Sequence, residues 1–374
     1  MNIDWEGKDS RILENPNMPQ AQKQVLDLHR EELLHKDNLM WFQSSGTTSK
    51  SPTAMKWIGL TRDNLLSSAN AVNQWIQSDS GDTWLMSLPE FHVGGLSILA
   101  RAHLTGANVV QTDGRWDPQS FIEKIEKSKV TICSLVPTQV YDLIRLNLRC
   151  PKGLRVVFVG GGRISENLYA LARKLDWPVL ITYGMTEAAS QIATASISSL
   201  ESDAYPNVHV LPHLDCSQTA EGRLILKGPS VTSVIAQFED HRLEFQQYSN
   251  DFVTDDIVEL SADKKYILSV SRVGRTVKTL GELADLDQLQ NLFNQQNSEY
   301  LDCHIWYLPD SRKENEIVAV SSQLQNWDKV QAAIISYNLH APKWCRIDKI
   351  YYLKNLPKSP LGKILWGELS ALLS

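Results

Sequence analysis

A run of small hydroxyl residues around a glycine follows the apolar, strand-like segment Leu39–Phe42. Backbone N–H groups and side-chain hydroxyls in such a loop can surround phosphate oxygens. The spacing does not fit GxxxxGK[ST], so this is not a Walker A loop. The same composition is also typical of a solvated surface loop, and this segment alone does not decide between the two. The residues are Ser44, Ser45, Gly46, Thr47, Thr48, Ser49 and Lys50.

Two further polar segments come directly after apolar, strand-like runs. Gly160–Gly162 ends one such run and precedes a helical pattern, and open α/β sheets bind nucleotides at such turns. Thr182–Glu187 follows the next run, and its Thr186 hydroxyl and Glu187 carboxylate could hold Mg²⁺ beside phosphates. A glycine turn without a ligand and an ordinary helix start remain the alternative interpretations.

Lys363 follows a loop stiffened by proline and glycine near the end of the chain. A lysine held at the end of such a loop could meet an anionic ligand. A plain surface charge is the alternative. We find no Ser-His-Asp or Cys-His arrangement that would require a covalent intermediate. His209 and His213 have helical spacing, but Pro212 between them argues against a helix and a metal pair.

The elements that must position these residues alternate between strand and helix from Trp57 to Leu180. This alternation predicts right-handed crossovers and a largely parallel sheet, hence an α/β fold. The expected strands are Thr83–Ser87, Asn108–Gln111, Val130–Val136, Arg155–Val159 and Val179–Thr182. The expected helices are Met18–Lys36, Arg62–Gln77, Asp117–Ser128, Thr138–Asn147 and Ser165–Leu175.

The length of 374 residues indicates two or three folding units. We expect a large N-terminal domain over residues 1–272, in which residues 205–266 form a small β subdomain of short strands broken by glycine and proline. Residues 273–374 mix strands and helices and are expected to form a smaller α+β domain.

Composition narrows the function classes. The net charge is −6 without a basic stretch, which argues against a nucleic-acid partner. No apolar run approaches the ~20 residues that span a bilayer, and the first residues lack a signal-peptide layout, so we expect no membrane insertion. Five scattered cysteines without CxxC predict buried thiols in a reducing cytoplasm.

The motifs occur together and in an order that resembles the adenylate-forming superfamily of acyl-CoA synthetases, luciferases and adenylation domains. The resemblance spans roughly Leu39 to Leu369. Within the superfamily, TYGMTEAASQIAT, WLMSLPEFHVGGL and VPTQ are most similar to the o-succinylbenzoate–CoA ligase family. The resemblance implies ATP-dependent conversion of 2-succinylbenzoate to an acyl-adenylate and then to a CoA thioester, in menaquinone or phylloquinone biosynthesis. Mg²⁺ would be the cofactor, with ATP and CoA as co-substrates.

The resemblance also implies a role for each motif. The Ser44–Lys50 loop would cover the β- and γ-phosphates, with Lys363, Thr186, Glu187 and His92 as the catalytic residues and Glu187 on the metal. The nucleotide would be held by Gly160, Gly161, Gly162, Tyr183, Gly184, Thr186, Asp256 and Arg272. The acyl substrate would be held by His92, Gly94, Arg101, Ser134, Thr138 and Ser190. Gly274 would be the hinge about which the C-terminal domain moves.

Arg101 bears most directly on the acid substrate. It matches an arginine that pairs with the distal carboxylate of succinylbenzoate, and a guanidinium fork suits a second carboxylate. An arginine on a helix surface is the alternative for Arg101, and a core histidine is the alternative for His92.

The sequence also departs from the family pattern. Ser49 replaces a loop glycine, the usual Pro-Lys becomes Ser51-Pro52 with Lys56 further on, and Asp255 replaces the glycine of TGD. Relatives carry roughly a hundred more residues before the loop, so the N-terminal domain is expected to be abridged or covered in a homo-oligomer. Another carboxylic acid as substrate, or a nucleotide-binding module without turnover, remain the alternative functions. An intact Glu187 and Lys363 argue against the second.

Overall fold

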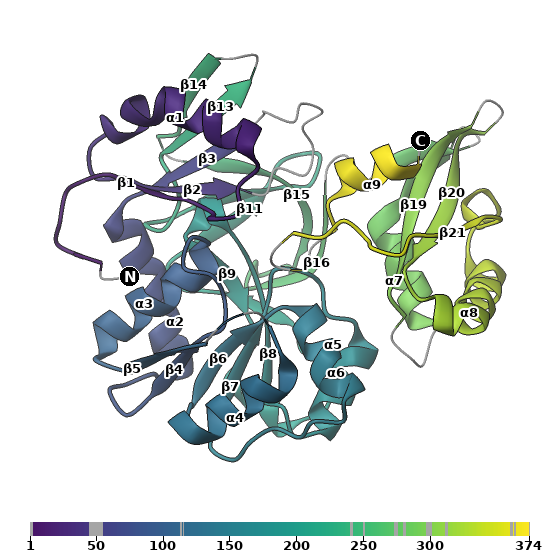
Figure 1. The fold of residues 1–374 in the computed structure, drawn as a ribbon, viewed down its shortest axis with the longest axis horizontal. Coiled ribbons are helices and arrows are strands. Elements are labelled where there is room, and N and C mark those ends of the chain that lie inside the picture. The colour runs from purple at the N-terminus through teal and green to yellow at the C-terminus, as the bar shows by residue number, and fades with distance from the viewer. Residues whose placement is uncertain are drawn as a thin grey trace.

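The computed structural model describes residues 3–44, 55–112, 114, 116–239, 242–249, 251–272, 276–279, 282–296, 301–310, 313–359, 362 and 364–373. In Figure 1 the chain up to about Arg272 builds the larger, layered part of the molecule, and the green-to-yellow C-terminal part lies beside it. The α/β fold expected from the sequence is confirmed.

One half of the 11-stranded sheet is parallel, as the strand–helix alternation predicts. Its strands lie in the order β5-β4-β6-β7-β8. They are β4 (Thr83–Met86), β5 (Asn108–Gln111), β6 (Ile132–Leu135), β7 (Val156–Val159) and β8 (Val179–Met185).

Helices cover both faces of this parallel half (Figure 1). α2 (Arg62–Ile76) and α3 (Val93–Thr105) pack on the face that carries Trp84, Ile132 and Phe158. The opposite face carries the alternate residues and is covered by α4 (Pro118–Ser128), α5 (Pro137–Arg145) and α6 (Glu166–Lys174). Period-two alternation along each strand therefore divides the core into two layers.

The strand order reverses between β4 and β6. From β4 the chain crosses to β5 on one side, and from β6 it proceeds to β7 and β8 on the other. In open α/β sheets such a reversal leaves a crevice at the carboxyl ends of the two strands, where ligands bind. The fold therefore places a candidate site at the ends of β4 and β6.

Antiparallel strands continue the sheet beyond β8. They are β9 (Ser190–Thr194), β10 (Val208–Val210), β16 (Tyr266–Arg272), β15 (Phe252–Leu260), β12 (Arg223–Lys227) and β11 (Asp215–Gln218). A separate five-stranded sheet joins β1 (Arg11–Leu13), β2 (Met40–Ser44), β3 (Met55–Leu60), β13 (Val234–Glu239) and β14 (Arg242–Gln247), with α1 (Gln20–Leu34) packed on it. The strands of residues 205–266 are thus divided between two sheets.

The C-terminal part has a hydrophobic core of its own, built from residues between Val277 and Leu369. Its strands are β17 (Thr276–Thr279), β18 (Glu282–Asp285), β19 (Cys303–Asp310), β20 (Glu314–Ser321) and β21 (Ile350–Tyr352). Its helices are α7 (Leu286–Gln295), α8 (Trp327–His340) and α9 (Trp366–Leu373). Short 3₁₀ turns complete the chain: η1 (Thr186–Ala188), η2 (Ile197–Glu201), η3 (Leu324–Asn326) and η4 (Lys343–Cys345).

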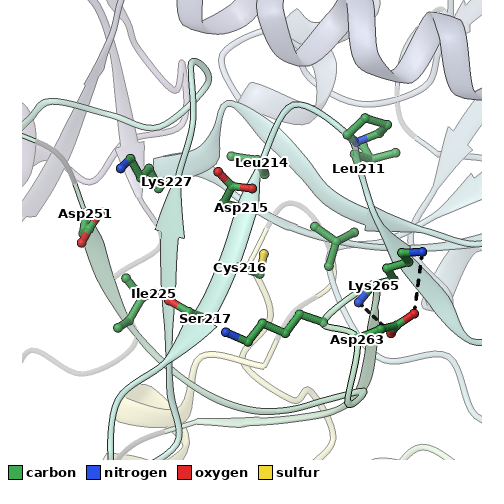
Figure 2. Close-up of a pocket in the computed structure, with 13 residues that line it drawn as sticks. Leu211, Leu214, Asp215, Cys216, Ser217, Ile225, Lys227, Asp251, Asp263 and Lys265 are labelled. Atoms are coloured by element: carbon green, nitrogen blue, oxygen red, sulfur yellow. Dashed lines mark hydrogen bonds and ion pairs between the residues drawn. The ribbon is translucent and has the colours of Figure 1, made fainter.

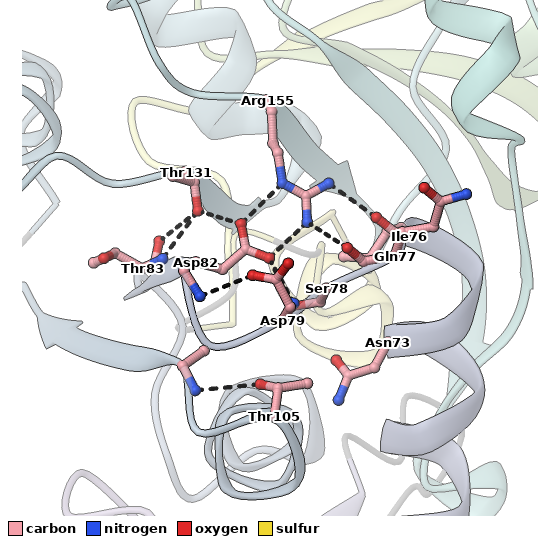
Figure 3. A network of polar contacts seen from close by, with 12 residues as sticks. Asn73, Ile76, Gln77, Ser78, Asp79, Asp82, Thr83, Thr105, Thr131 and Arg155 are labelled. Carbon is pink, nitrogen blue, oxygen red and sulfur yellow. Dashed lines mark hydrogen bonds and ion pairs between the residues drawn. The ribbon is translucent and has the colours of Figure 1, made fainter.

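A polar network ties together the amino ends of the parallel strands, opposite the crevice (Figure 3). Asp82 directly precedes β4, Thr131 precedes β6 and Arg155 precedes β7. The carboxylate of Asp82 accepts from Arg155 Nε at 2.9 Å, from Arg155 Nη2 at 2.6 Å and from Thr131 Oγ1 at 2.8 Å. Although burial alone would raise the pKa of Asp82, these hydrogen bonds and one from Ser78 lower it to about 2.

Two expectations about whole-chain properties can be compared with the structure. Among the described residues, no helix has the length and apolarity needed to cross a membrane. All five cysteines are free thiols, and four of them are buried, in agreement with the sequence interpretation.

Candidate active site at the sheet switch point

The ends of β4 and β6 are joined by a hydrogen bond from the Ser87 hydroxyl to the Ser134 carbonyl. From β4 the chain runs through Phe91 and His92 into α3, whose N-cap is His92. The aromatic rings of Phe91 and His92 are 4.6 Å apart. Gly95 lets α3 begin this close to the loop, because a Cβ there would lie 2.1 Å from the carbonyl oxygen of Pro89.

The Tyr183–Glu187 segment brings strand β8 into tight contact with β9. A Cβ on Gly184 would lie 1.8 Å from the carbonyl oxygen of Ser190, so the backbone excludes every other residue at this position. The ladder between β8 and β9 has a register shift between Tyr183 and Gly184. Ala189 and Ser190 have positive φ angles of 52° and 111°, and such strained backbone is concentrated at functional sites.

Two residues assigned to the nucleotide lie in direct contact. The Tyr183 hydroxyl donates to Asp256 Oδ2 at 2.7 Å, and Asp256 on β15 is the register partner of Arg272 on β16. The neighbouring Asp255 is exposed and pairs instead with Arg223 at 2.9 Å. The extra charge of Asp255 is therefore bound outside this cluster, and Asp256 lies beside the tyrosine.

Glu187 forms an ion pair that the sequence analysis did not anticipate. Lys56 on β3 donates from Nζ to Glu187 Oε1 at 2.7 Å, and both side chains are partly buried. Thr232 also fixes the backbone, because its N–H donates to the Glu187 carbonyl at 2.8 Å. The sequence analysis noted Lys56 only as the lysine beyond the altered Pro-Lys position, and no local pattern joins it to Glu187, which is 131 residues away in sequence.

The donor set around Glu187 fits a magnesium ion. Mg²⁺ takes one or two protein carboxylates and completes its shell with water and substrate phosphates. Glu187 offers one carboxylate beside the Thr186 hydroxyl, and only its Oε1 accepts from Lys56. Among the described residues there is no group of three or more His, Cys, Asp or Glu side chains that would hold a metal without a substrate.

Gly160 lets the turn after β7 pack closely against β8. A Cβ on Gly160 would lie 2.8 Å from Thr182 Cγ2, and Gly161 has a φ of +75°. Gly161 and Gly162 are exposed at the carboxyl end of the sheet, beside the start of α5. Bare backbone at this edge gives a flat ligand such as a purine close access.

Of the residues expected to hold the acyl substrate, Arg101 and Ser134 lie on the face of the sheet that α3 covers, whereas Thr138 lies on α5, which covers the opposite face. Ser134 follows Ile132 at a spacing of two and therefore points with it toward α3. From α3, the Ser97 hydroxyl lies 3.5 Å from that of Ser190, and Arg101 follows one turn later. Ser97 is a residue that the sequence analysis missed, although its position four before Arg101 on one helix was visible.

Arg101 is buried, which excludes the interpretation of a helix-surface arginine. It is 1% exposed, and its guanidinium lies 5.4 Å from the Trp84 ring and 5.5 Å from the Phe158 ring. Neither Nε nor Nη2 has a hydrogen-bond partner among the described residues. Desolvation by burial lowers the pKa of Arg101 to about 9, so the cation is held in an environment that penalises its charge.

The C-terminal part reaches this site at α5. Gly362, which precedes Lys363 in sequence, has a φ of +73°, and a Cβ there would lie 2.6 Å from Thr138 Oγ1. One turn along α5, the Tyr141 hydroxyl is 3.5 Å from Gln323 Nε2. Lys363 itself, Gly274 (expected as the hinge), Ser45–Lys50 and the side chain of Arg272 lie outside what the structure describes.

A separate cavity of about 560 Å³ opens between β11, β12 and the turn between β15 and β16 (Figure 2). Three lysines and three aspartates line it: Lys227, Lys264, Lys265, Asp215, Asp251 and Asp263. None of the residues that the sequence assigns to ATP or acid lines this cavity, and its mixed charges favour no ligand of one sign.

The chain is similar to known ligases in both sequence and fold. It is 33% identical over 210 residues to a 2-succinylbenzoate–CoA ligase of Bacillus licheniformis, covering 54% of this chain and 43% of that protein. It is 26% identical over 347 residues to the ligase of the same name from Lactococcus lactis, covering 87% of this chain and 69% of that protein. The chain thus spans between about two fifths and two thirds of these relatives' lengths.

A solved structure shares the fold. An o-succinylbenzoate CoA synthetase from Bacillus subtilis, in complex with its acyl-adenylate intermediate, superposes with a TM-score of 0.70 at 24% identity, covering 88% of this chain and 68% of that one. The sequence model of the AMP-binding enzyme family matches residues 5–234, more than half of the chain. The chain belongs to the family of AMP-binding enzymes.

Proposed function

We propose that this protein is an AMP-forming acid–thiol ligase that uses ATP to activate 2-succinylbenzoate and transfers the acyl group to CoA. Activation forms a mixed anhydride between the carboxylate and the α-phosphate of ATP and releases pyrophosphate. Attack by the CoA thiol then releases AMP and yields the thioester. The pathway we propose for this product is the biosynthesis of menaquinone or phylloquinone, in the cytoplasm.

The observation that carries the substrate assignment is the buried cation of Arg101. The Arg101 guanidinium is 1% exposed, and its Nε and Nη2 have no hydrogen-bond partner among the described residues, so its burial is costly unless an anion meets it. Ser97 and Ser134 lie on the same face as Arg101, and the Ser97 hydroxyl lies 3.5 Å from that of Ser190. A diacid would place its distal carboxylate at Arg101 and its reacting carboxylate near the strand ends.

The nucleotide roles follow from the contacts at β8 and β15. Tyr183, held by Asp256, would line the adenine together with Gly160–Gly162, and Asp256 with Arg272 would hold the ribose. Glu187 and Thr186 would hold Mg²⁺, which when bound would neutralise charge on the phosphates. Lys56 keeps Glu187 in place through its 2.7 Å ion pair. Lys363 would stabilise the charge that develops at the α-phosphate during adenylation.

We further propose a division into an ATP- and acid-binding domain over residues 1–272 and a C-terminal domain that moves about Gly274. The separate hydrophobic core between Val277 and Leu369 supports this division. In the present arrangement Gly362 touches Thr138, which suits the adenylation step. Thioester formation would use another face of the C-terminal domain.

A panel of carboxylic acids tests the proposal. The purified chain is incubated with ATP, Mg²⁺, CoA and one acid at a time, and AMP formation is measured. We expect 2-succinylbenzoate to give the highest kcat/KM, and benzoate without the distal carboxylate to give a much lower value. Equal use of the diacid and the monoacid would refute the substrate assignment, and no AMP from any acid would refute the ligase.

A further inference from the structure

Asp302 holds an ion-pair cluster at the end of the C-terminal sheet that none of the proposed catalytic roles uses. Its carboxylate accepts from Lys358 Nζ at 3.1 and 3.0 Å, from the Ser322 hydroxyl at 2.8 Å, and contacts His304 Nε2 at 3.0 Å. Its backbone carbonyl accepts from the Ser321 hydroxyl at 2.9 Å. Both carboxylate oxygens are therefore engaged, at the point where β19 begins and β20 ends.

The Asp302 carboxylate stays ionised over a wide pH range. The Asp302 side chain is 17% exposed, and burial alone would raise its pKa. The contacts with His304, Lys358 and Ser322 instead hold the pKa of Asp302 well below the usual range of an aspartate. An ionised carboxylate with several donors fixes the position of Lys358 more firmly than a single exposed ion pair would.

Lys358 stands at the base of the loop that carries Lys363. Lys358 and Ile364 form an antiparallel bridge, and the N–H of Leu365 donates to the Pro357 carbonyl at 2.9 Å. Within the loop, the N–H of Gly362 donates to the Ser359 carbonyl at 2.8 Å. The segment is thus closed at its base by the pairing of Lys358 with Ile364, and Asp302 holds Lys358 at that base.

The far side of this loop meets the N-terminal part. Gly362 contacts Thr138 on α5, and Gln323, directly after Ser322, reaches Tyr141 one turn along the same helix. The cluster around Asp302 therefore lies between the core of the C-terminal sheet and its contact with α5. A shift of Lys358 would be transmitted to Gly362, and from there to Lys363.

We propose that Asp302 is a positioning residue for adenylation: by fixing Lys358 it holds Gly362, the neighbour of Lys363 in sequence, against Thr138 on α5. This inference rests on the proposed function, because it concerns the step that Lys363 would assist. It assigns Asp302 no contact with substrate. It requires that loss of the Asp302 carboxylate slow acyl-adenylate formation and spare the reaction of a finished acyl-adenylate with CoA.

The experiment separates the two half-reactions. Pyrophosphate release from ATP and 2-succinylbenzoate without CoA measures adenylation, and thioester formation from pre-made acyl-adenylate and CoA measures the second step. For Asp302→Asn we expect kcat of adenylation to fall about 10–100-fold, the size expected for a misplaced catalytic group. The KM for ATP and the rate of the second step should change less than about threefold.

Variants of Lys358 test the same contact from its other side. Lys358→Met should reproduce the loss of adenylation rate. Lys358→Arg should retain most of that rate, because arginine still pairs with the Asp302 carboxylate. The double variant Asp302→Asn with Lys358→Met should be no slower than the slower of the two single variants, because both remove the same contact.

Glu316→Gln is the matched control. Glu316 on β20 is 8% exposed and pairs with Lys349 at 2.6 Å and Lys313 at 3.2 Å. We expect it to leave adenylation unchanged.

Each outcome decides the question. An adenylation loss that is selective for Asp302 and Lys358, with Lys358→Arg active, supports the inference. Equal loss of both half-reactions, or the same loss in Glu316→Gln, would show a purely structural role and overturn it. Wild-type adenylation by Asp302→Asn overturns the inference alone. A wild-type chain that releases no pyrophosphate with any acid overturns the proposed function, and the inference with it.

Discussion

Replacing Arg101 with methionine should stabilise the free protein and at the same time remove its preference for a diacid. Burial lowers the pKa of Arg101 to about 9, which corresponds to a cost of about 5 kcal/mol for carrying the charge inside the fold. Cation–π contacts with the rings of Trp84 and Phe158 offset about 2–3 kcal/mol of this cost of burying the charge. A methionine of similar volume, although shorter, fills most of the space without the charge, so the free energy of unfolding should rise by about 1–3 kcal/mol.

Arg62 provides the matched control for the stability measurement. It is 2% exposed, but its guanidinium donates to the carbonyls of Asp4 and Asp9 at 2.8 and 3.0 Å and to Asn38 Oδ1 at 3.3 Å. Arg62→Met leaves these acceptors without their donor and should lower the free energy of unfolding. Denaturant unfolding of both variants without ligands gives the comparison. Destabilisation by Arg101→Met equal to that by Arg62→Met would refute the reasoning.

Kinetics provide the second readout for Arg101. Arg101→Met should lower kcat/KM for 2-succinylbenzoate by an amount that corresponds to about 2–5 kcal/mol of lost transition-state stabilisation, the range for breaking a buried charge pair. The kcat/KM for benzoate should change little. Arg101→Lys should rescue only part of the loss, because it supplies charge without the planar fork. ATP affinity without acid should not change. If both acids lose equally, or neither loses, Arg101 is not the carboxylate anchor.

Three further predictions concern other parts of the molecule. Lys363→Ala should slow adenylation about 10²–10³-fold while thioester formation from pre-made acyl-adenylate survives, and collapse of both half-reactions would contradict the assigned role. Glu187→Gln should raise the Mg²⁺ concentration needed for half-maximal turnover, and an unchanged metal titration with full activity would refute the metal assignment. Asp82→Asn should lower the free energy of unfolding by about 2–4 kcal/mol at pH 7. Because the pKa of Asp82 is about 2 when folded and higher when unfolded, this difference should shrink as the pH falls from about 4 toward 2, which unfolding curves at several pH values can check.

The parallel half of the sheet could be predicted from the sequence almost strand by strand. Mostly apolar runs of four to seven residues between helical patterns identify β4 to β8, and the helix expected over Ser165–Leu175 is α6, with Ser165 as its N-cap and the Ser165 hydroxyl accepting from the Leu168 N–H. Local spacing is most informative for β6 and β7, because these strands are buried along their whole length between two helical layers.

The contacts that join distant segments could not be predicted in this way. The pairing of Lys56 with Glu187 and the contact of Gly362 with Thr138 depend on how sheets and helices pack, which no local pattern records. The division of residues 205–266 between two sheets has the same cause, since β13 pairs with β3, far away in sequence. The sequence also left undecided whether Arg101 is buried or lies on a helix surface. Its helix is apolar on most sides, so periodicity alone did not show which residues face inward.

The base that β2 and β3 form suggests where this protein can tolerate changes in length. Ser44 and Lys56 are register partners at the ends of β2 and β3, and both strands lie in the interior of the five-stranded sheet. Residues 45–54 therefore begin and end at a base held by neighbours on both sides. Closing a loop costs only about 0.6 kcal/mol more for each doubling of its length. Insertions or deletions between Ser44 and Lys56 should thus leave the rest of the fold nearly as stable, so that evolution or a designer can vary the segment expected to cover the phosphates independently of the scaffold.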